Sequence, residues 1–226
     1  TIDHLDNYHP RIKVSWDNSL GLPYFVANNI ILTAEDTLSI GAGTIIKFAY
    51  HDTERYKYKM ICDGYLDLQG TSTNPVVFTS ERDDSYGGDT NGDGVTTYPA
   101  AGDWGYIQIH SPSFSNAIVR YGGRFHDLYV TGIHQDYMLW VQHPDATVSN
   151  CEFTDSYRSA VYTDPVNDFT ITNSSFTNCY VGIDCQGVNP YSSTASITNN
   201  TVTGGADVGI QLKGFQCPLW YQVIRL

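Results

Sequence analysis

The sequence has few basic residues and no long apolar run, and each scarcity excludes a class of protein. Twelve Lys and Arg oppose 24 Asp and Glu, a net charge of -12 that repels phosphate backbones and anionic membrane surfaces. Nucleic acid is therefore not an expected partner. No stretch approaches the roughly 18 apolar residues of a membrane span, and no basic-then-apolar signal segment opens the chain at Thr1. We expect a processed or trimmed product.

Cysteine and methionine are also scarce. Five cysteines cannot all pair within one chain, and they show neither a CxxC pair nor a Cys/His spacing typical of a metal site. Only 2 Met stand against 20 Gly and 17 Tyr, a balance that favours strands and turns over helices and predicts an all-β chain. The cysteines are Cys62, Cys151, Cys179, Cys185 and Cys217.

A ten-residue pattern recurs three times in the second half, at residues 146–155, 169–178 and 195–204. The intervals are 23 and 26 residues, and apolar residues alternate with Thr, Ser or Asn within each copy. Alternation repeated at this spacing predicts a solenoid of short stacked strands. The coinciding apolar residues are Val148, Ile171 and Ile197 at one position, and Phe153, Phe176 and Val202 at another.

Each copy is followed by a second short apolar strand, and similar segments occur upstream. Segment 104–110 matches the second strand type, while segment 117–123 aligns with the start of the repeat, 29 residues before Ala146. About seven coils are expected within a single domain, 1–226, with strands separated by glycines at corners. The predicted division is an N-terminal capping region (1–36), coils (37–214) and a C-terminal strand or cap (215–226).

Asparagine occupies one equivalent position in all three copies, immediately after the first strand: Asn150, Asn173 and Asn199. Stacked in register, their amides could bond to one another and to turn backbone as an internal ladder. Asn173 and Asn199 also lie in N-x-S/T sequons, but we favour the ladder over sugar attachment.

These features resemble the right-handed β-helix proteins of the pectate-lyase-like superfamily. The resemblance is carried by segments 38–48, 75–80 and 103–107 together with the Asn-bearing repeats, and it covers roughly residues 14 to 215. It implies a right-handed parallel β-helix, secreted or attached to a microbial surface. Such proteins include polysaccharide lyases, glycosidases, epimerases, adhesins and modules without known activity, so the fold alone does not fix the chemistry.

The loop beginning at Glu81 contains the pattern of a calcium site. Asp89, Asn91 and Asp93 followed by Gly94 reproduce the D-x-N-x-D-G start of a calcium loop, in which alternate oxygens point at one ion. Position 12 of the pattern is Ala100 rather than Glu. We therefore expect the set of Ca²⁺ ligands to be completed from Asp83, Asp84 and Asp103, with the ion ordering the loop rather than acting in catalysis.

A lyase would need a base to abstract a proton next to a uronate carboxylate, and cations or Ca²⁺ to neutralise that carboxylate. Arg120, Arg124 and Lys213 are the candidates, although a surface arginine paired with neighbouring acids is the favoured interpretation of Arg120. The histidines show no identifying spacing. A glycosidase would need two carboxylates, for which the candidates are Asp155, Asp164, Asp168 and Asp184.

Aromatic side chains are the remaining candidates for ligand contact. Rings that remain exposed on strand faces can stack on sugars. The candidates are Tyr106, Tyr121, Tyr137 and Trp140, with Tyr157, Tyr162 and Tyr180 also beside the strand faces. The favoured hypothesis is a noncatalytic extracellular or cell-surface module, structural or adhesive, with polysaccharide or a surface glycan as its partner. The alternatives are a polysaccharide lyase or other carbohydrate-active enzyme on uronate-containing glycans, and a filament or oligomer subunit that associates end to end.

Overall fold

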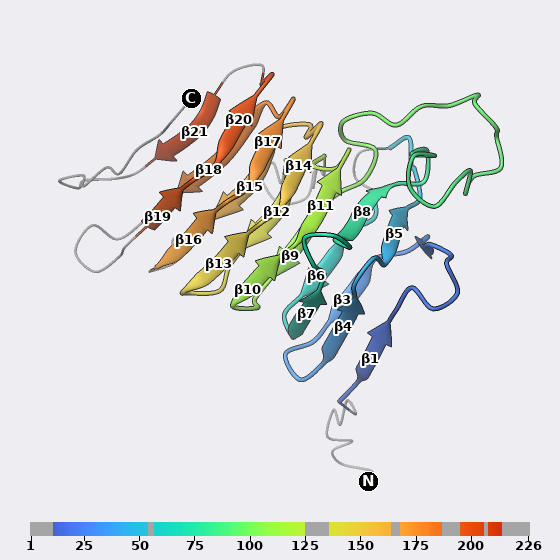
Figure 1. Ribbon diagram of the computed structural model, residues 1–226, viewed down its shortest axis with the longest axis horizontal. Coiled ribbons are helices and arrows are strands. Elements are labelled where there is room, and N and C mark those ends of the chain that lie inside the picture. Colours follow the sequence, from blue (N-terminus) through green and yellow to red (C-terminus); the bar gives the residue numbers. More distant parts are fainter. Residues whose placement is uncertain are drawn as a thin grey trace, which may run out of the picture.

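The computed structural model describes residues 11–53, 57–124, 136–163, 168–186, 195–205 and 208–213. Within these ranges the regular structure consists of strands alone, and every pair of neighbouring strands runs parallel. Figure 1 shows the strands stacked in coils along the long axis, from the N-terminal coil in blue to the C-terminal coil in red. The protein is a right-handed parallel β-helix.

Each coil contributes three strands, so the stack has three faces. Face 1 consists of two adjacent sheets, and faces 2 and 3 are seven-stranded sheets, so the part of the chain that the structure describes makes the expected seven coils. The strands of face 1 are β1 (Lys13–Trp16), β4 (Thr37–Gly41), β7 (Tyr65–Gln69), β10 (Ser113–Ser115), β13 (Ala146–Ser149), β16 (Phe169–Thr172) and β19 (Ala195–Thr198).

Faces 2 and 3 follow in the same order along every coil. Face 2 contains β2 (Tyr24–Val26), β5 (Ile45–Phe48), β8 (Val76–Ser80), β11 (Ala117–Arg120), β14 (Glu152–Thr154), β17 (Ser175–Thr177) and β20 (Thr201–Thr203). Face 3 contains β3 (Ile30–Leu32), β6 (Met60–Cys62), β9 (Ile107–Ile109), β12 (Tyr137–Val141), β15 (Ser159–Thr163), β18 (Val181–Gln186) and β21 (Val208–Lys213).

The register confirms the alignment of the three copies. Val148 pairs with Ile171, which pairs with Ile197, and Phe153, Phe176 and Val202 form a second row. The upstream alignment of residue 117 with Ala146 is wrong, because β11 belongs to face 2 and pairs with β14, while the partner of β13 is β10. The two strand types share the same alternation, so pattern alone could not separate them.

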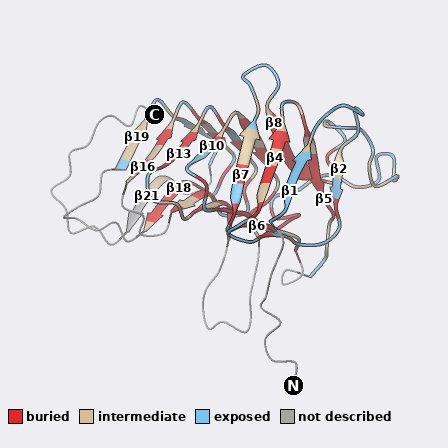
Figure 2. Cartoon of the chain, turned by 90° about the horizontal axis from the view of Figure 1, so that it is seen from below, coloured by how far each residue is buried: buried red, intermediate tan, exposed pale blue. Residues whose placement is uncertain are grey.

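The core is one continuous column of apolar side chains inside the stack. Like residues lie on like, and the rings of Phe153 and Phe176 stack at 5.2 Å between centroids with an interplanar angle of 3°. Figure 2 shows buried residues along the strands of the middle coils and exposed residues in β1 and β2. Burial is therefore greatest where a coil has a neighbour on both sides.

The N-terminal stretch predicted as a cap contains a coil of the stack. β1, β2 and β3 pair in parallel with β4, β5 and β6, so the coils begin before residue 37. This first coil has a neighbour on one side within the described residues, and its core side chains are only partly covered. Trp16 and Tyr24 stack at 4.8 Å across its open end. The boundary at residue 36 therefore does not separate a cap from the coils.

Candidate functional site

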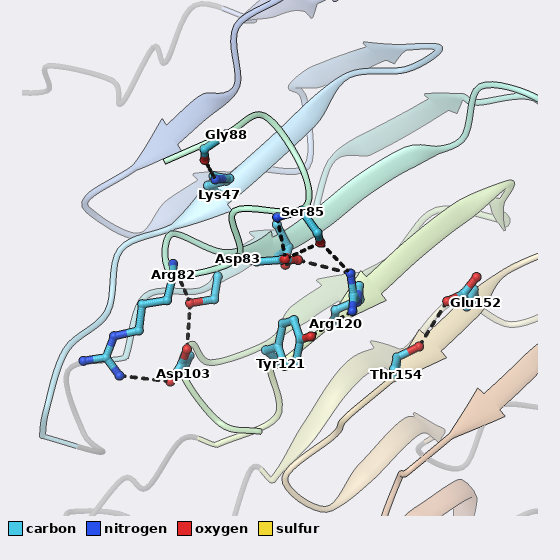
Figure 3. A network of polar contacts seen from close by, with 12 residues as sticks. Lys47, Arg82, Asp83, Ser85, Gly88, Asp103, Arg120, Tyr121, Glu152 and Thr154 are labelled. Carbon is cyan, nitrogen blue, oxygen red and sulfur yellow. Dashed lines mark hydrogen bonds and ion pairs between the residues drawn. The ribbon is translucent and has the colours of Figure 1, made fainter. Parts of the chain in front are cut away.

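The loop between β8 and β9 is anchored over face 2 by a network of charged side chains (Figure 3). Arg120 Nη1 lies 3.3 Å from Asp83 Oδ2, and the same nitrogen donates to Ser85 Oγ at 3.2 Å. Asp83 also accepts a hydrogen bond from Thr79 Oγ1 at 2.6 Å. The side chains of Arg120 and Asp83 are only 19% and 3% exposed. Arg120 therefore pairs with an acid, as expected, but the pair is largely buried.

Asp103 fixes the other end of the loop. Its Oδ2 accepts hydrogen bonds from Ser80 Oγ at 2.7 Å and from the backbone N–H of Ala100 at 3.2 Å. Arg82 Nη1 lies 3.6 Å from Oδ1. Burial raises the pKa of Asp103, and these hydrogen bonds together with Arg82 oppose the rise. Asp83 and Asp103 thus fasten the loop to β8 and β11 through protein partners.

A buried lysine that the sequence argument missed lies beneath the same loop. Lys47 pairs in register with Phe25 and Thr79 on face 2, and its Nζ donates to the carbonyl of Gly88. Burial lowers the pKa of Lys47, while the carboxylates of the loop raise it in part. Because Lys47 lies between Ile46 and Phe48, alternation predicts that its side chain points out of the coil. The sequence does not show that the loop then covers this side chain.

The predicted calcium loop folds on itself. Asp89 accepts hydrogen bonds from the backbone N–H groups of Gly92, Asp93 and Gly94 at 2.8, 3.1 and 2.9 Å. Asn91 Nδ2 donates to Asp93 Oδ2 at 2.9 Å. Within the described residues, the Oδ1 atoms of Asn91 and Asp93 are buried and have no hydrogen-bond partner. Two oxygens of the predicted ligand set therefore remain available to a cation.

Of the other members of the predicted calcium set, only Asp89 hydrogen-bonds to this pair within the described residues, because its Oδ1 accepts from the Asp93 backbone N–H. Asp83 and Asp103 are held in the loop network, and Asp84 is exposed. In the described part of the chain, no group of three or more His, Cys, Asp or Glu side chains is arranged to hold a metal ion. A calcium site here would have to combine Asn91 and Asp93 with backbone carbonyls or water.

The three cations considered for a lyase are not brought together. Arg120 ends β11 on face 2, whereas Lys213 ends β21 on face 3, three coils further along and so about 14 Å away along the axis. The Arg124 guanidinium lies 4.5 Å from the centroid of the Tyr157 ring. His126, His134 and Asp164 lie outside the described residues.

Aromatic side chains gather on the outer side of face 3. Tyr106 and Tyr137 meet at 5.4 Å between centroids, and the Tyr137 ring stacks on Tyr162 at 4.8 Å. Trp140 lies 5.3 Å from Tyr137 and 6.4 Å from Tyr162. We call these four residues the aromatic cluster. Tyr162 is also a predicted candidate for sugar contact, and it pairs in register with Trp140.

The side chains predicted to contact glycan differ in how exposed they are. Tyr106 and Tyr137 are only 2% and 5% exposed, so their faces are not open to a sugar, whereas Trp140 is partly exposed. Tyr121 lies away from the cluster at the end of β11, where its hydroxyl accepts a hydrogen bond from Arg120 Nη2 at 2.8 Å. Within the cluster, Trp140 and Tyr162 are the rings that can meet a ligand.

Polar side chains flank these two rings in the same row of the sheet. Trp140 pairs in register with Gln108 on one side and Tyr162 on the other, and Tyr162 pairs with Asp184. Asp184 is buried, and its Oδ1 has no hydrogen-bond partner within the described residues. The row therefore places an amide, two aromatic rings and a carboxylate on consecutive coils, and of these four side chains the two rings are partly exposed.

The predicted asparagine ladder is wrong by one residue. Asn150, Asn173 and Asn199 adopt φ angles of 54°, 51° and 55°, and all three are exposed. The inward positions belong to the residues that follow them: Ser174 Oγ accepts from the Cys151 N–H at 3.1 Å, and Asn200 Oδ1 accepts from the Ser174 N–H at 3.0 Å. The left-handed residue reverses the turn, so its own side chain points outward.

The four cysteines within the described residues are free thiols, and all are buried. Burial raises the pKa of Cys151 and of Cys185 to about 12 and that of Cys179 to about 11. These thiols are therefore protonated at neutral pH and fill core positions. Cys217 lies outside the described residues.

Comparison with known families agrees with this architecture. Residues 115–217 match the family model of the right-handed β-helix region, and residues 11–105 match that of the pectate-lyase-like β-helix domain. No curated protein and no solved structure matches the chain. Among the described residues there is no helix long and apolar enough to cross a membrane. The chain belongs to the right-handed β-helix repeat proteins of the pectate-lyase-like superfamily.

Proposed function

We propose that the chain is a noncatalytic extracellular β-helical module that binds glycan on the outer side of face 3. The observation that carries this proposal is the row in which Gln108, Trp140, Tyr162 and Asp184 follow one another on consecutive coils. Rings bind the C–H faces of sugars, and the partly exposed Trp140 and Tyr162 provide such rings, whereas Gln108 and Asp184 are buried beside them. Buried Tyr106 and Tyr137 support the two outer rings from behind.

The contacts of the Arg120 side chain support a noncatalytic role rather than lyase activity. A base that abstracts a proton must reach the substrate in its neutral form. The Arg120 guanidinium instead pairs with Asp83, and it also donates to Ser85 and Tyr121. Its removal from these partners would leave Asp83 unpaired beneath the loop, at a substantial cost in stability.

Glycan binding is tested by titrating the protein with a panel of neutral and uronate oligosaccharides in a calorimeter. We expect Trp140→Ala and Tyr162→Ala each to weaken binding about fivefold, because an aromatic contact contributes roughly 1 kcal/mol. Tyr65→Ala, which removes an exposed tyrosine from face 1, should leave the affinity unchanged. Equal affinities in all four proteins would contradict the proposed site.

The same panel tests the absence of catalysis. Lyase action on a uronate chain creates an unsaturated product that absorbs ultraviolet light. We expect no rise in absorbance with any substrate, with or without Ca²⁺. A rise would reject the noncatalytic proposal.

We further propose that Ca²⁺ stabilises the loop between β8 and β9 through Asn91 and Asp93. Both buried Oδ1 atoms lack a hydrogen-bond partner, and a cation would satisfy them together. Calcium should slow proteolytic cleavage of the loop in the wild type, and Asp93→Asn should abolish this protection. Asp52→Asn, an exposed acid elsewhere, is the matched control. Protection that persists in Asp93→Asn would exclude this site.

A further inference from the structure

A groove of about 510 Å³ runs along the turn between faces 1 and 2. It is lined by the loop from Thr71 to Pro75 and by Ala117 and Ile118 at the start of β11. Residues from three consecutive turns, at 150–152, 173–175 and 199–201, complete the lining. The groove therefore lies parallel to the axis of the solenoid and crosses equivalent positions of successive coils.

This groove is lined by the three asparagines that point outward instead of forming the predicted ladder. Asn150, Asn173 and Asn199 are exposed, and within the described residues none of their side-chain amides hydrogen-bonds to protein. The backbone N–H groups of Asn150 and Asn173 already donate to the carbonyls of Thr172 and Thr198 on the next coil. The groove thus offers side-chain amides for recognition, and these turn N–H groups are not available to pair with an added β-strand.

The chemistry of the lining excludes a polyanion. Among the described residues that line the groove, Glu152 is the one that carries a charge, and the protein as a whole has a net charge of -12. The remaining polar groups are the amides and the hydroxyls of Ser and Thr, while Pro75, Ala117 and Ile118 provide an apolar surface. Amides and hydroxyls beside an apolar floor match the hydroxyls and C–H groups of a neutral sugar.

The spacing of the amides adds a geometric condition. Equivalent residues of successive coils are about 4.8 Å apart, the separation of paired strands. This distance is close to the length that one pyranose residue adds to an extended 1,4-linked chain. We propose that the groove binds a neutral, linear, 1,4-linked polysaccharide along the solenoid axis, with about one sugar contacted by each of the three asparagine turns.

This site is separate from the aromatic cluster on face 3 and does not depend on it. The test is calorimetric titration with neutral 1,4-linked hexasaccharides of glucose, xylose and mannose, and with a hexagalacturonate. The variant is the double substitution Asn173→Gly and Asn199→Gly, because glycine keeps the left-handed backbone while removing the amide. Asn178→Gly is the matched control: Asn178 also has a positive φ of 54°, but its amide donates to Asp155 in the turn after face 2.

We expect at least one neutral hexasaccharide to bind, and the double variant to bind it about tenfold more weakly, since each lost hydrogen bond contributes roughly 1 kcal/mol or less. Asn178→Gly should bind as the wild type does. Undiminished binding by the double variant, binding of hexagalacturonate alone, or no binding at all would overturn the proposal. If Trp140→Ala removes neutral-glycan binding and the double variant does not, the proposal for the groove fails while that for face 3 stands.

Discussion

The repeating coils from β13 onward and the loop between β8 and β9 bury their side chains through different kinds of contact. In the coils, a residue is covered by its counterparts above and below, as Phe176 is by Phe153 and Val202. In the loop there is no counterpart to stack on. Its contacts are individual pairings such as Asp83 with Arg120 and Asp103 with Ser80.

The difference lies in how specific each interaction is. Apolar stacking tolerates exchange, because Val148, Ile171 and Ile197 all fill one row of face 1. The charged pairs of the loop tolerate little, because removal of either partner leaves a buried charge uncompensated. Trp104 joins the two regions: its ring stacks on Phe48 in the core at 4.4 Å, and its Nε1 donates to the Arg120 carbonyl at 2.8 Å.

The largest expected effect comes from a cavity in the stack. Phe176→Ala removes a fully buried ring between two coils and should lower the free energy of unfolding by about 3–5 kcal/mol. Urea unfolding followed by circular dichroism measures the loss. Tyr98→Ala, in the exposed part of the loop, is the control and should change stability by less than about 0.5 kcal/mol. If the two substitutions lowered the free energy of unfolding equally, the proposed difference in burial between the coils and the loop would be refuted.

A smaller loss is expected from the loop network. Asp83→Asn removes the charge that faces Arg120 and should cost about 2–3 kcal/mol, below the loss for a fully buried pair because Arg120 keeps some contact with water. The measurement is urea unfolding in the presence of a calcium chelator. Asp84→Asn, its exposed neighbour, should have almost no effect. If both variants were as stable as the wild type, the network would not be what anchors the loop.

This comparison also separates what the sequence could predict from what it could not. The stacked strands, the seven coils and the paired rows of the C-terminal copies followed from alternation repeated at solenoid spacing. The family followed from the resemblance that segments 38–48, 75–80 and 103–107 carry together with these repeats. The misplacement of residue 117 came from the same source, since face 1 and face 2 strands share one pattern. Periodicity shows which residues point inward but not which face of the coil they belong to.

Sites were predicted less well because they depend on contacts between coils. The acids of the loop were recognised, but nothing in the sequence showed that Asp83 and Asp103 would be taken by Arg120 and Ser80. The aromatic residues were recognised too, but the burial of Tyr106 and Tyr137 depends on neighbours in other strands. The asparagine positions were aligned correctly, and only the φ angle determined which way they point.

The left-handed turns allow a test within one repeat position. Asn173→Ala should cost about 1 kcal/mol, because asparagine adopts the left-handed region at φ 51° more readily than alanine does, whereas Asn173→Gly should cost a few tenths at most. Urea unfolding of the two variants gives the difference directly. Equal stabilities for Ala and Gly would show that the turn does not depend on left-handed geometry, and the explanation for the outward asparagines would fail.

The smallest expected effect is a dependence of stability on pH at Asp103. Because burial raises the pKa of Asp103 in the folded state above its ordinary value of 3.8, the folded protein holds this proton more tightly than the unfolded chain does. The contribution of Asp103 to stability is therefore fully present below pH 3.8 and is lost as the pH rises through the folded-state pKa. The measurement is the difference in unfolding free energy between the wild type and Asp103→Asn across this range. As the pH rises, the unfolding free energy of the wild type should fall relative to that of Asp103→Asn, by less than about 1 kcal/mol for a modest displacement of the pKa. A shift in favour of the wild type would mean that the hydrogen bonds from Ser80 and Ala100, together with Arg82, outweigh burial, and that the loop, unlike the stack, gains stability from an ionised group in its interior.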